Sequence, residues 1–192
     1  MGSESENLWL AEQWQLYRDR LHKLFAVRMP EVLLRRMSVD DLLQETYVAC
    51  GRRLEFLRAE PEVPMYLKLR KLALQVLADQ QRRHLGAGKR DAMKESALPE
   101  SDDRTMDAWA QFVDTISSPR THMVRLERQA LMRRVLAELS PADREILELR
   151  HFEELGNTEC ALVLGVAPKA ASIRYVRALK RLRDLLQGAS LF

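Results

Sequence analysis

The sequence predicts an all-α protein that consists of two small helical domains joined by an acidic linker. Leu, Ala, Arg and Glu dominate its 192 residues, and all four favour helices. Only 7 glycines and 7 prolines interrupt the chain, and few stretches alternate apolar and polar residues with the period of two that marks a strand. Because 46% of the residues are hydrophobic, the chain can build globular cores, and its length permits one domain or two small ones.

Charged residues favour two domains because their distribution along the chain is uneven. The net charge is only +3, but residues 68–94 carry eight basic side chains against two acids. Residues 95–118 carry six acids against one arginine, a net charge of −5. A basic block, an acidic tether and a second basic block predict two nucleic-acid-facing modules with a solvated linker. We therefore expect domains at residues 8–94 and 119–192, with the linker at 95–118.

The first domain is predicted to be a succession of amphipathic helices. Apolar residues at helical spacing place these helices at about residues 14–25, 32–37, 39–57 and 65–85. Ser38 is expected to cap the third helix, with Asp40 and Asp41 in its first turn, where the helix dipole favours acids.

The linker contains one apolar cluster at three- and four-residue spacing: Met106, Trp109, Phe112, Val113 and Ile116. Such a cluster is too large to be left wholly in water without some function. We expect a short helix that docks on one of the two modules and is released when a partner separates them. A disordered tether with incidental apolar residues is the alternative, because its flanks are polar.

The second domain is predicted to end in a helix-turn-helix. Helices are expected over about residues 123–139, from Pro141 after the capping residue Ser140, over 158–164, and from Pro168. Gly165 supplies the permissive backbone of the turn. The last helix carries six basic side chains against Asp184, the arrangement that places a helix in the DNA major groove: Lys169, Arg174, Arg177, Lys180, Arg181 and Arg183. Its buried stripe is predicted to be Ile173, Val176, Leu179, Leu182 and Leu186, and an ordinary helical hairpin is the alternative.

The sequence contains no constellation of residues that indicates catalysis. The four histidines are scattered, and Cys50 and Cys160 lie in apolar helical patterns, which predicts buried free thiols rather than a metal site. Asp40, Asp41 and Glu45 could hold a divalent ion, but capping or partner contacts are commoner for acids in a first turn. A secretion signal and a bilayer-length apolar run are absent. We expect a cytoplasmic protein that is not an enzyme, has no metal or cofactor, and does not insert into a membrane.

Three motifs, in order, resemble the bacterial sigma-70 family. SVDDLLQETYVA resembles the region 2 helix that binds the clamp helices of RNA polymerase, and LADQQRRHLGAGKRD resembles the basic end of that region. LSPADREILELRHFEEL, with the helix-turn-helix and VRALKRLRDLL after it, resembles region 4. The spacing leaves no room for region 3, as in the extracytoplasmic-function group. The resemblance covers residues 14–186.

The resemblance implies core RNA polymerase and promoter DNA as partners, with an anti-sigma factor as a further candidate. It assigns polymerase binding to Asp41, Leu42, Gln44 and Glu45. It assigns the minus-ten element to Tyr66, Arg70, Lys71, Gln75, Arg82 and Arg83, and Lys68, Lys89 and Arg90 add positive charge that can neutralise phosphates. It assigns the minus-thirty-five element to Lys169, Ser172, Ile173 and Arg177 at base edges, and to Arg174, Lys180 and Arg181 at phosphates.

One departure concerns the helix that opens the promoter, where the family usually carries Trp-Leu and later Arg-Asn. This chain has Met65-Tyr66-Leu67 and Leu74-Gln75-Val76. Either other residues capture a flipped base, or the promoter preference differs. The sequence has two alternative interpretations: a dimeric helix-turn-helix regulator that binds an operator, and a helical adaptor or anti-sigma factor.

Overall fold

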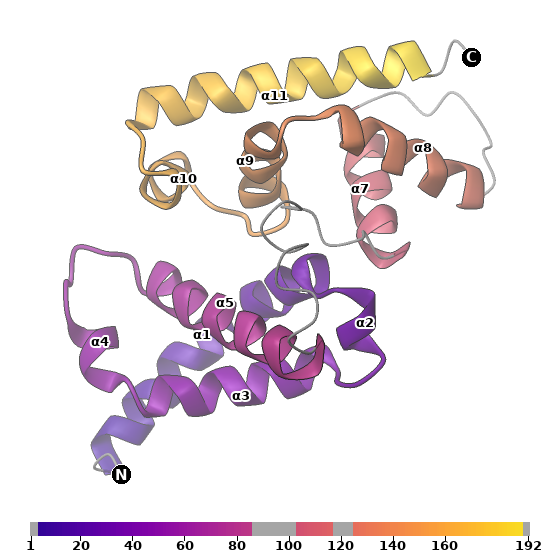
Figure 1. The fold of residues 1–192 in the computed structure, drawn as a ribbon. Coiled ribbons are helices and arrows are strands. Elements are labelled where there is room, and N and C mark those ends of the chain that lie inside the picture. The colour runs from indigo at the N-terminus through magenta and orange to yellow at the C-terminus, as the bar shows by residue number, and fades with distance from the viewer. Residues whose placement is uncertain (1–3, 86–102, 117–124, 190–192) are drawn as a thin grey trace. The chain divides into compact units, whose positions relative to one another are not determined.

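The computed structural model describes residues 4–85, 103–116 and 125–189, and every regular element in these ranges is a helix (Figure 1). The chain divides into two compact units, residues 1–99 and 100–192. The prediction of an all-α protein is therefore confirmed. No helix in the described ranges is long and apolar enough to cross a membrane.

In its described residues, 4–85, the first unit contains five helices: α1 (Glu4–Arg28), α2 (Glu31–Leu34), α3 (Val39–Gly51), α4 (Leu54–Arg58) and α5 (Met65–Leu85). Helix α3 packs against both α1 and α5, so it lies at the centre of the unit. The core consists of side chains that these helices turn inward, among them Leu21, Leu24, Phe25, Leu42, Leu57 and Leu69. Cys50 is a buried free thiol, as expected, and burial raises its pKa to about 12.

Helix α3 begins as predicted but ends earlier. The Ser38 hydroxyl accepts a hydrogen bond from the Asp41 backbone N–H (3.1 Å), and the Asp41 carboxylate accepts one from the Ser38 backbone N–H (2.7 Å), which is a capping box. The helix stops at Gly51, and α4 begins at Leu54. The prediction of one helix over residues 39–57 is therefore wrong. Glycine weakens a helix, and the bend allows Leu57 to be fully buried.

Lys68 clamps the end of α4 from inside the first unit. Its side chain is only 5% exposed, and Nζ donates hydrogen bonds to the carbonyl oxygens of Leu57 (3.1 Å) and Ala59. Carbonyls at the end of a helix have no intrahelical partner, and a positive charge there also suits the helix dipole. The expectation that Lys68 neutralises phosphates is wrong because its ammonium group faces these carbonyls.

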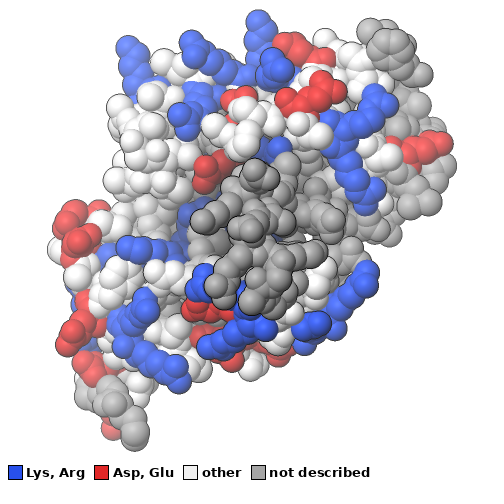
Figure 2. Space-filling view, viewed as in Figure 1, with Lys and Arg blue, Asp and Glu red and all other residues white. Residues whose placement is uncertain are grey.

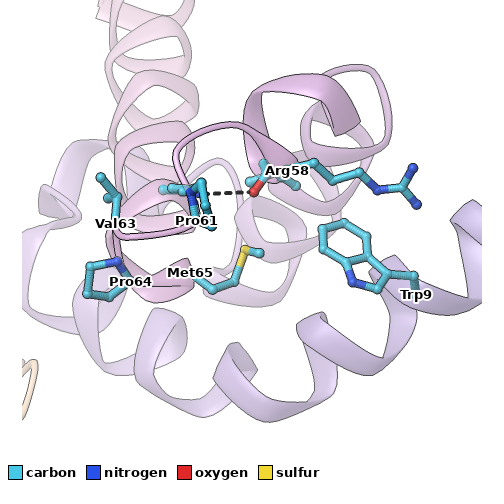
Figure 3. A pocket seen from close by; sticks show the side chains of 8 residues that line it. Trp9, Arg58, Pro61, Val63, Pro64 and Met65 are labelled. Atoms are coloured by element: carbon cyan, nitrogen blue, oxygen red, sulfur yellow. Dashed lines mark hydrogen bonds between the residues drawn. The ribbon is translucent and has the colours of Figure 1, made fainter.

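The Lys68 clamp lies beside a pocket of about 330 Å³. Figure 3 shows the pocket with the hydrogen bond from Lys68 to Leu57 as a dashed line. Trp9 from α1 lines it together with the loop before α5, and the Arg58 guanidinium lies over the Trp9 ring at 4.9 Å. Arg58 also pairs with Glu6 (3.3 Å), so α1 and α4 are joined at this end of the unit.

The second unit contains α7 (Asp103–Ile116), α8 (Arg125–Glu138), α9 (Pro141–His151), α10 (Asn157–Leu164) and α11 (Pro168–Ala189). Ser140 caps α9 by accepting a hydrogen bond from the Asp143 backbone N–H (3.1 Å), with proline in the first turn as predicted. Helix α11 contacts α8, α9 and α10. Cys160 is a buried free thiol.

Helix α7 is the described part of the predicted linker, and it packs in the second unit. One face of the helix is buried: Met106, Trp109, Ala110, Phe112 and Val113. The Trp109 ring meets the Phe152 ring edge to face at 5.1 Å, and Asp107 accepts a hydrogen bond from Gln129 of α8 (2.9 Å). The docking prediction is therefore confirmed and the tether alternative is wrong for this segment. The units divide between Pro99 and Glu100, not after residue 118 as we expected.

We predict that Lys68→Met destabilises the first unit. Methionine keeps much of the apolar stem but leaves the Leu57 and Ala59 carbonyls without their partner, which costs about 1–3 kcal/mol. Urea denaturation of the full chain, with hydrogen exchange to locate the loss in α4 and α5, measures the effect. Lys71→Met is the matched control, because Lys71 is exposed on the same helix. Equal effects from the two substitutions would contradict the clamp.

Candidate nucleic-acid interface

The turn between α10 and α11 is built on a left-handed glycine. Gly165 has φ 63° and ψ 35°, a conformation that side chains with a Cβ rarely adopt. The Val166 backbone N–H donates to the Ala161 carbonyl (3.0 Å), which closes the end of α10. The Asn157 amide donates to the Pro168 carbonyl (2.9 Å), so the first residues of the two helices are joined directly. These contacts form the helix-turn-helix that the sequence predicted.

Helix α11 packs through small residues on its rear face. Its buried residues are Ala171, Ala178, Leu182 and Leu186. The predicted stripe is correct at Leu182 and Leu186 but wrong at Ile173 and Val176, which are 43% and 61% exposed. The prediction considered only large apolar side chains. The contact is made in part by alanines, which let α11 approach its neighbours closely.

The opposite face of α11 carries exposed cations around two apolar side chains. Lys169, Ser172, Ile173, Val176, Arg177 and Lys180 are all exposed, at spacings of three and four residues that put them on one helical face. Figure 2 shows Lys and Arg side chains along the edge of the unit formed by α11. Arg181 is exposed, and Arg174 is partly buried. Val176 is the residue that the sequence interpretation missed, because its apolar character suggested burial.

The predicted minus-ten residues separate into an exposed group and a buried group. Lys71, Gln75, Arg82 and Arg83 of α5 are exposed. Tyr66 is 1% exposed and Arg70 is 8% exposed, so neither can present its side chain to DNA in this conformation, and we correct both assignments. The Tyr66 ring instead lies under the Arg20 guanidinium, 3.8 Å from the ring centroid.

Two residues that the sequence did not single out join this exposed part of α5. Arg53 Nη1 donates to the Gln75 side-chain oxygen (2.8 Å), and the Lys71 ammonium lies 5.3 Å from the centre of the Phe56 ring. The bend between α3 and α4 brings both residues to α5. A cationic surface with an aromatic ring suits single-stranded DNA, because cations neutralise phosphates and a ring can stack on a base.

Helix α3 presents a mixed polar and apolar face to solvent. Gln44, Glu45 and Val48 are exposed, and Val48 is 48% exposed. Leu42 is fully buried in the core, so it cannot be a partner contact in the folded unit, and we correct that assignment. Asp41 is exposed, but its carboxylate caps the helix, and the Ser38 backbone N–H and hydroxyl lower its pKa.

The acids at the start of α3 are engaged in contacts of their own. Asp40 pairs with Arg18 of α1 (2.9 Å), and Asp41 caps its own helix. Within the described parts of the chain, no group of three side chains is arranged to hold a metal ion.

Comparison with known proteins identifies the second unit most directly. The family model for sigma-70 region 4 matches residues 129–182, which covers α9, α10 and most of α8 and α11. The chain is 28% identical over 157 residues to RNA polymerase sigma factor NccH of Alcaligenes xylosoxydans xylosoxydans, which covers 79% of this chain and 75% of that protein. It is 35% identical over 63 residues to RNA polymerase sigma-E factor of Streptomyces avermitilis, covering 33% of this chain and 35% of that protein.

These matches agree with the helix-turn-helix and its exposed cationic face. Members of the family bind core RNA polymerase and promoter DNA. Together, the region 4 match and the two sigma-factor relatives support an extracytoplasmic-function protein of the sigma-70 family, whose members act in transcription initiation.

Proposed function

We propose that α3 binds core RNA polymerase, that the exposed part of α5 contacts the minus-ten element, and that α11 reads the minus-thirty-five element. The observation that carries this proposal is the exposed face of α11, the second helix of the helix-turn-helix. On this face, cations surround Ile173 and Val176. In this scheme the chain has no catalytic activity of its own and works in the cytoplasm with the polymerase. An anti-sigma factor stays a prediction.

The α11 face has the chemistry that base recognition requires. Arg and Lys can donate hydrogen bonds to guanine in the major groove, and apolar side chains contact the methyl group of thymine. Arg177 lies next to Val176 in the centre of the face, which suits contact with base edges. Lys180 and Arg181 lie further along the helix, which suits phosphates that give affinity without sequence information.

In the first unit, α5 and α4 supply the cationic surface that we propose for the minus-ten element. Lys71, Gln75, Arg53 and Phe56 are in contact in two pairs, and Arg82 and Arg83 extend the cationic surface along α5. Phe56 is the aromatic side chain that we propose in place of Tyr66, whose ring is buried. Phe56 would then be the residue that captures a flipped base in this chain, whose helix α5 lacks the Trp-Leu pair that the family usually carries.

The exposed face of α3 suits a basic partner surface with an apolar centre. Gln44 and Glu45 offer an amide and a carboxylate, and Val48 is one turn further along the same face. Pull-down with core polymerase followed by run-off transcription tests the whole proposal. A one-to-one complex that initiates transcription supports it, whereas a dimer that binds duplex DNA tightly without polymerase would support the regulator instead.

We predict that the double variant Gln44→Ala, Glu45→Lys weakens core polymerase binding by about tenfold or more, which corresponds to about 1.4 kcal/mol. The fold should be unchanged, because both side chains are exposed and outside the cap. Asp41 is left intact, since its loss would also disturb the start of α3. Glu12→Lys makes the same charge reversal at an exposed position of α1 and is the control. Unchanged binding by the double variant would place the polymerase contact elsewhere.

We predict that Arg177→Ala and Arg181→Ala impair promoter use in different ways. A bidentate base contact contributes about 1–3 kcal/mol of discrimination, so Arg177→Ala should relax preference at one base position of the upstream element. Arg181→Ala should lower affinity evenly across sequences and reduce the salt slope by about one unit. The measurement is holoenzyme binding and transcription across a promoter library at several salt concentrations. Indistinguishable profiles for the two variants would rule out this division of roles.

A further inference from the structure

The N-terminal half of α11, which we propose contacts bases, packs against the rest of the second unit through few large side chains. Its fully buried residues there are Ala171 and Ala178, whose methyl groups fit closely but give a weak hold on rotation of the helix. Tyr175 lies between them on the same face and is part-buried. Its aromatic ring and hydroxyl are therefore well placed to fix the helix in one orientation.

Tyr175 is held by two neighbouring residues at the end of α9. Its hydroxyl oxygen lies 3.0 Å from His151 Nε2, a hydrogen-bond distance. The Arg150 guanidinium lies over the Tyr175 ring at 5.1 Å, and Arg150 is itself held by the Leu155 carbonyl (2.8 Å). A hydrogen bond is directional, so it restricts sliding and rotation of α11 in a way that apolar contacts do not.

His151 is in turn covered by α7. The Phe112 ring lies 3.9 Å from the imidazole, centroid to centroid, at an interplanar angle of 32°. Phe112 is 6% exposed and packs edge to face against Trp109 of its own helix. The imidazole thus contacts the ring of Phe112 from α7 and the ring of Tyr175 from α11.

These surroundings keep the imidazole neutral. Burial, followed by the charge of Arg150, lowers the pKa of His151 to about 4. The imidazole has Arg150 from α9, Phe112 from α7 and Tyr175 from α11 as neighbours, and of these three only Arg150 is charged at neutral pH. A neutral imidazole has one acceptor nitrogen, so the tyrosine hydroxyl donates to Nε2 when the ring proton is on Nδ1.

We propose that α7 is a positioning element for DNA recognition, in which Phe112 holds His151 in place and His151 orients the recognition helix through Tyr175. The proposal rests on the proposed function of α11. It extends the DNA-binding module beyond the residues that the region 4 model matches, 129–182, to include residues 103–116. It also requires α7 to stay docked in the promoter complex, contrary to the release that we expected from the sequence.

The first test compares promoter selectivity of holoenzymes that contain the full chain. Tyr175→Phe removes only the hydroxyl, and Phe112→Leu removes only the aromatic ring. Each should reduce the preference for the selected upstream element over random sequence by about two- to tenfold, the range expected for one hydrogen bond. Core polymerase binding should be unchanged. His151→Gln, which keeps a neutral acceptor, should retain more selectivity than His151→Leu.

Phe152→Leu is the matched control, because it removes another ring of the cluster, which contacts Trp109 and Phe112. It should destabilise the second unit as Phe112→Leu does and yet keep promoter selectivity. Equal loss of selectivity in both variants, or no loss in Phe112→Leu and Tyr175→Phe, would overturn the positioning role. If the wild-type chain neither bound core polymerase nor started transcription, the proposed function itself would fail, and this proposal with it.

Two spectroscopic readouts separate positioning from general stability. By histidine NMR, His151 in the free chain should titrate far below an ordinary histidine, and its pKa should rise in Phe112→Leu. For the complex, the chain is labelled with 5-hydroxytryptophan and carries Trp9→Phe and Trp14→Phe, so that only position 109 reports. Its emission should stay blue-shifted and protected from quencher when core polymerase and promoter bind. Exposure of position 109 in that complex, or an ordinary pKa for His151, would refute the proposal.

Discussion

Docking of α7 through its aromatic side chains is the contact on which the second unit depends. Trp109 is 1% exposed and meets Phe152, the residue that follows α9, while Phe112 lies against His151 at the end of that helix. Burial of large aromatic side chains is among the strongest favourable contributions that a small domain can make. Without α7, the rings at the end of α9 would lose these apolar partners. The helix is thus a structural part of the unit that carries the helix-turn-helix.

Buried cations at helix ends are a second constraint, and the two units share it. In the first unit Lys68 donates to carbonyls at the end of α4. In the second unit Arg144 is 7% exposed and donates to the Leu139 carbonyl just after α8 (3.3 Å), and burial lowers the pKa of its guanidinium. Each cation satisfies a carbonyl that the preceding helix leaves without a partner. The number of basic residues therefore overstates the positive surface that can face DNA.

The sequence by itself determined the helical class, most helix starts and the helix-turn-helix. These features depend on local chemistry: Ser38 and Ser140 cap helices, and Gly165 adopts the left-handed conformation that its turn requires. Such signals act over three or four residues, so they can be recognised without knowing what lies across the core. The exposed cations of α11 follow from the same helical spacing.

Tertiary structure alone decided which side chains are accessible and which unit α7 joins. Leu42, Tyr66 and Arg70 were assigned to partner contacts, but packing buries them, whereas Ile173 and Val176 are apolar and exposed. Periodicity gives the angle between side chains on a helix but not which face meets a neighbour, because that depends on how closely other helices approach. Alanines at 171 and 178 allowed that approach on one face of α11. The contact of Phe112 with His151 joins residues 39 positions apart, and only the packed fold brings them together.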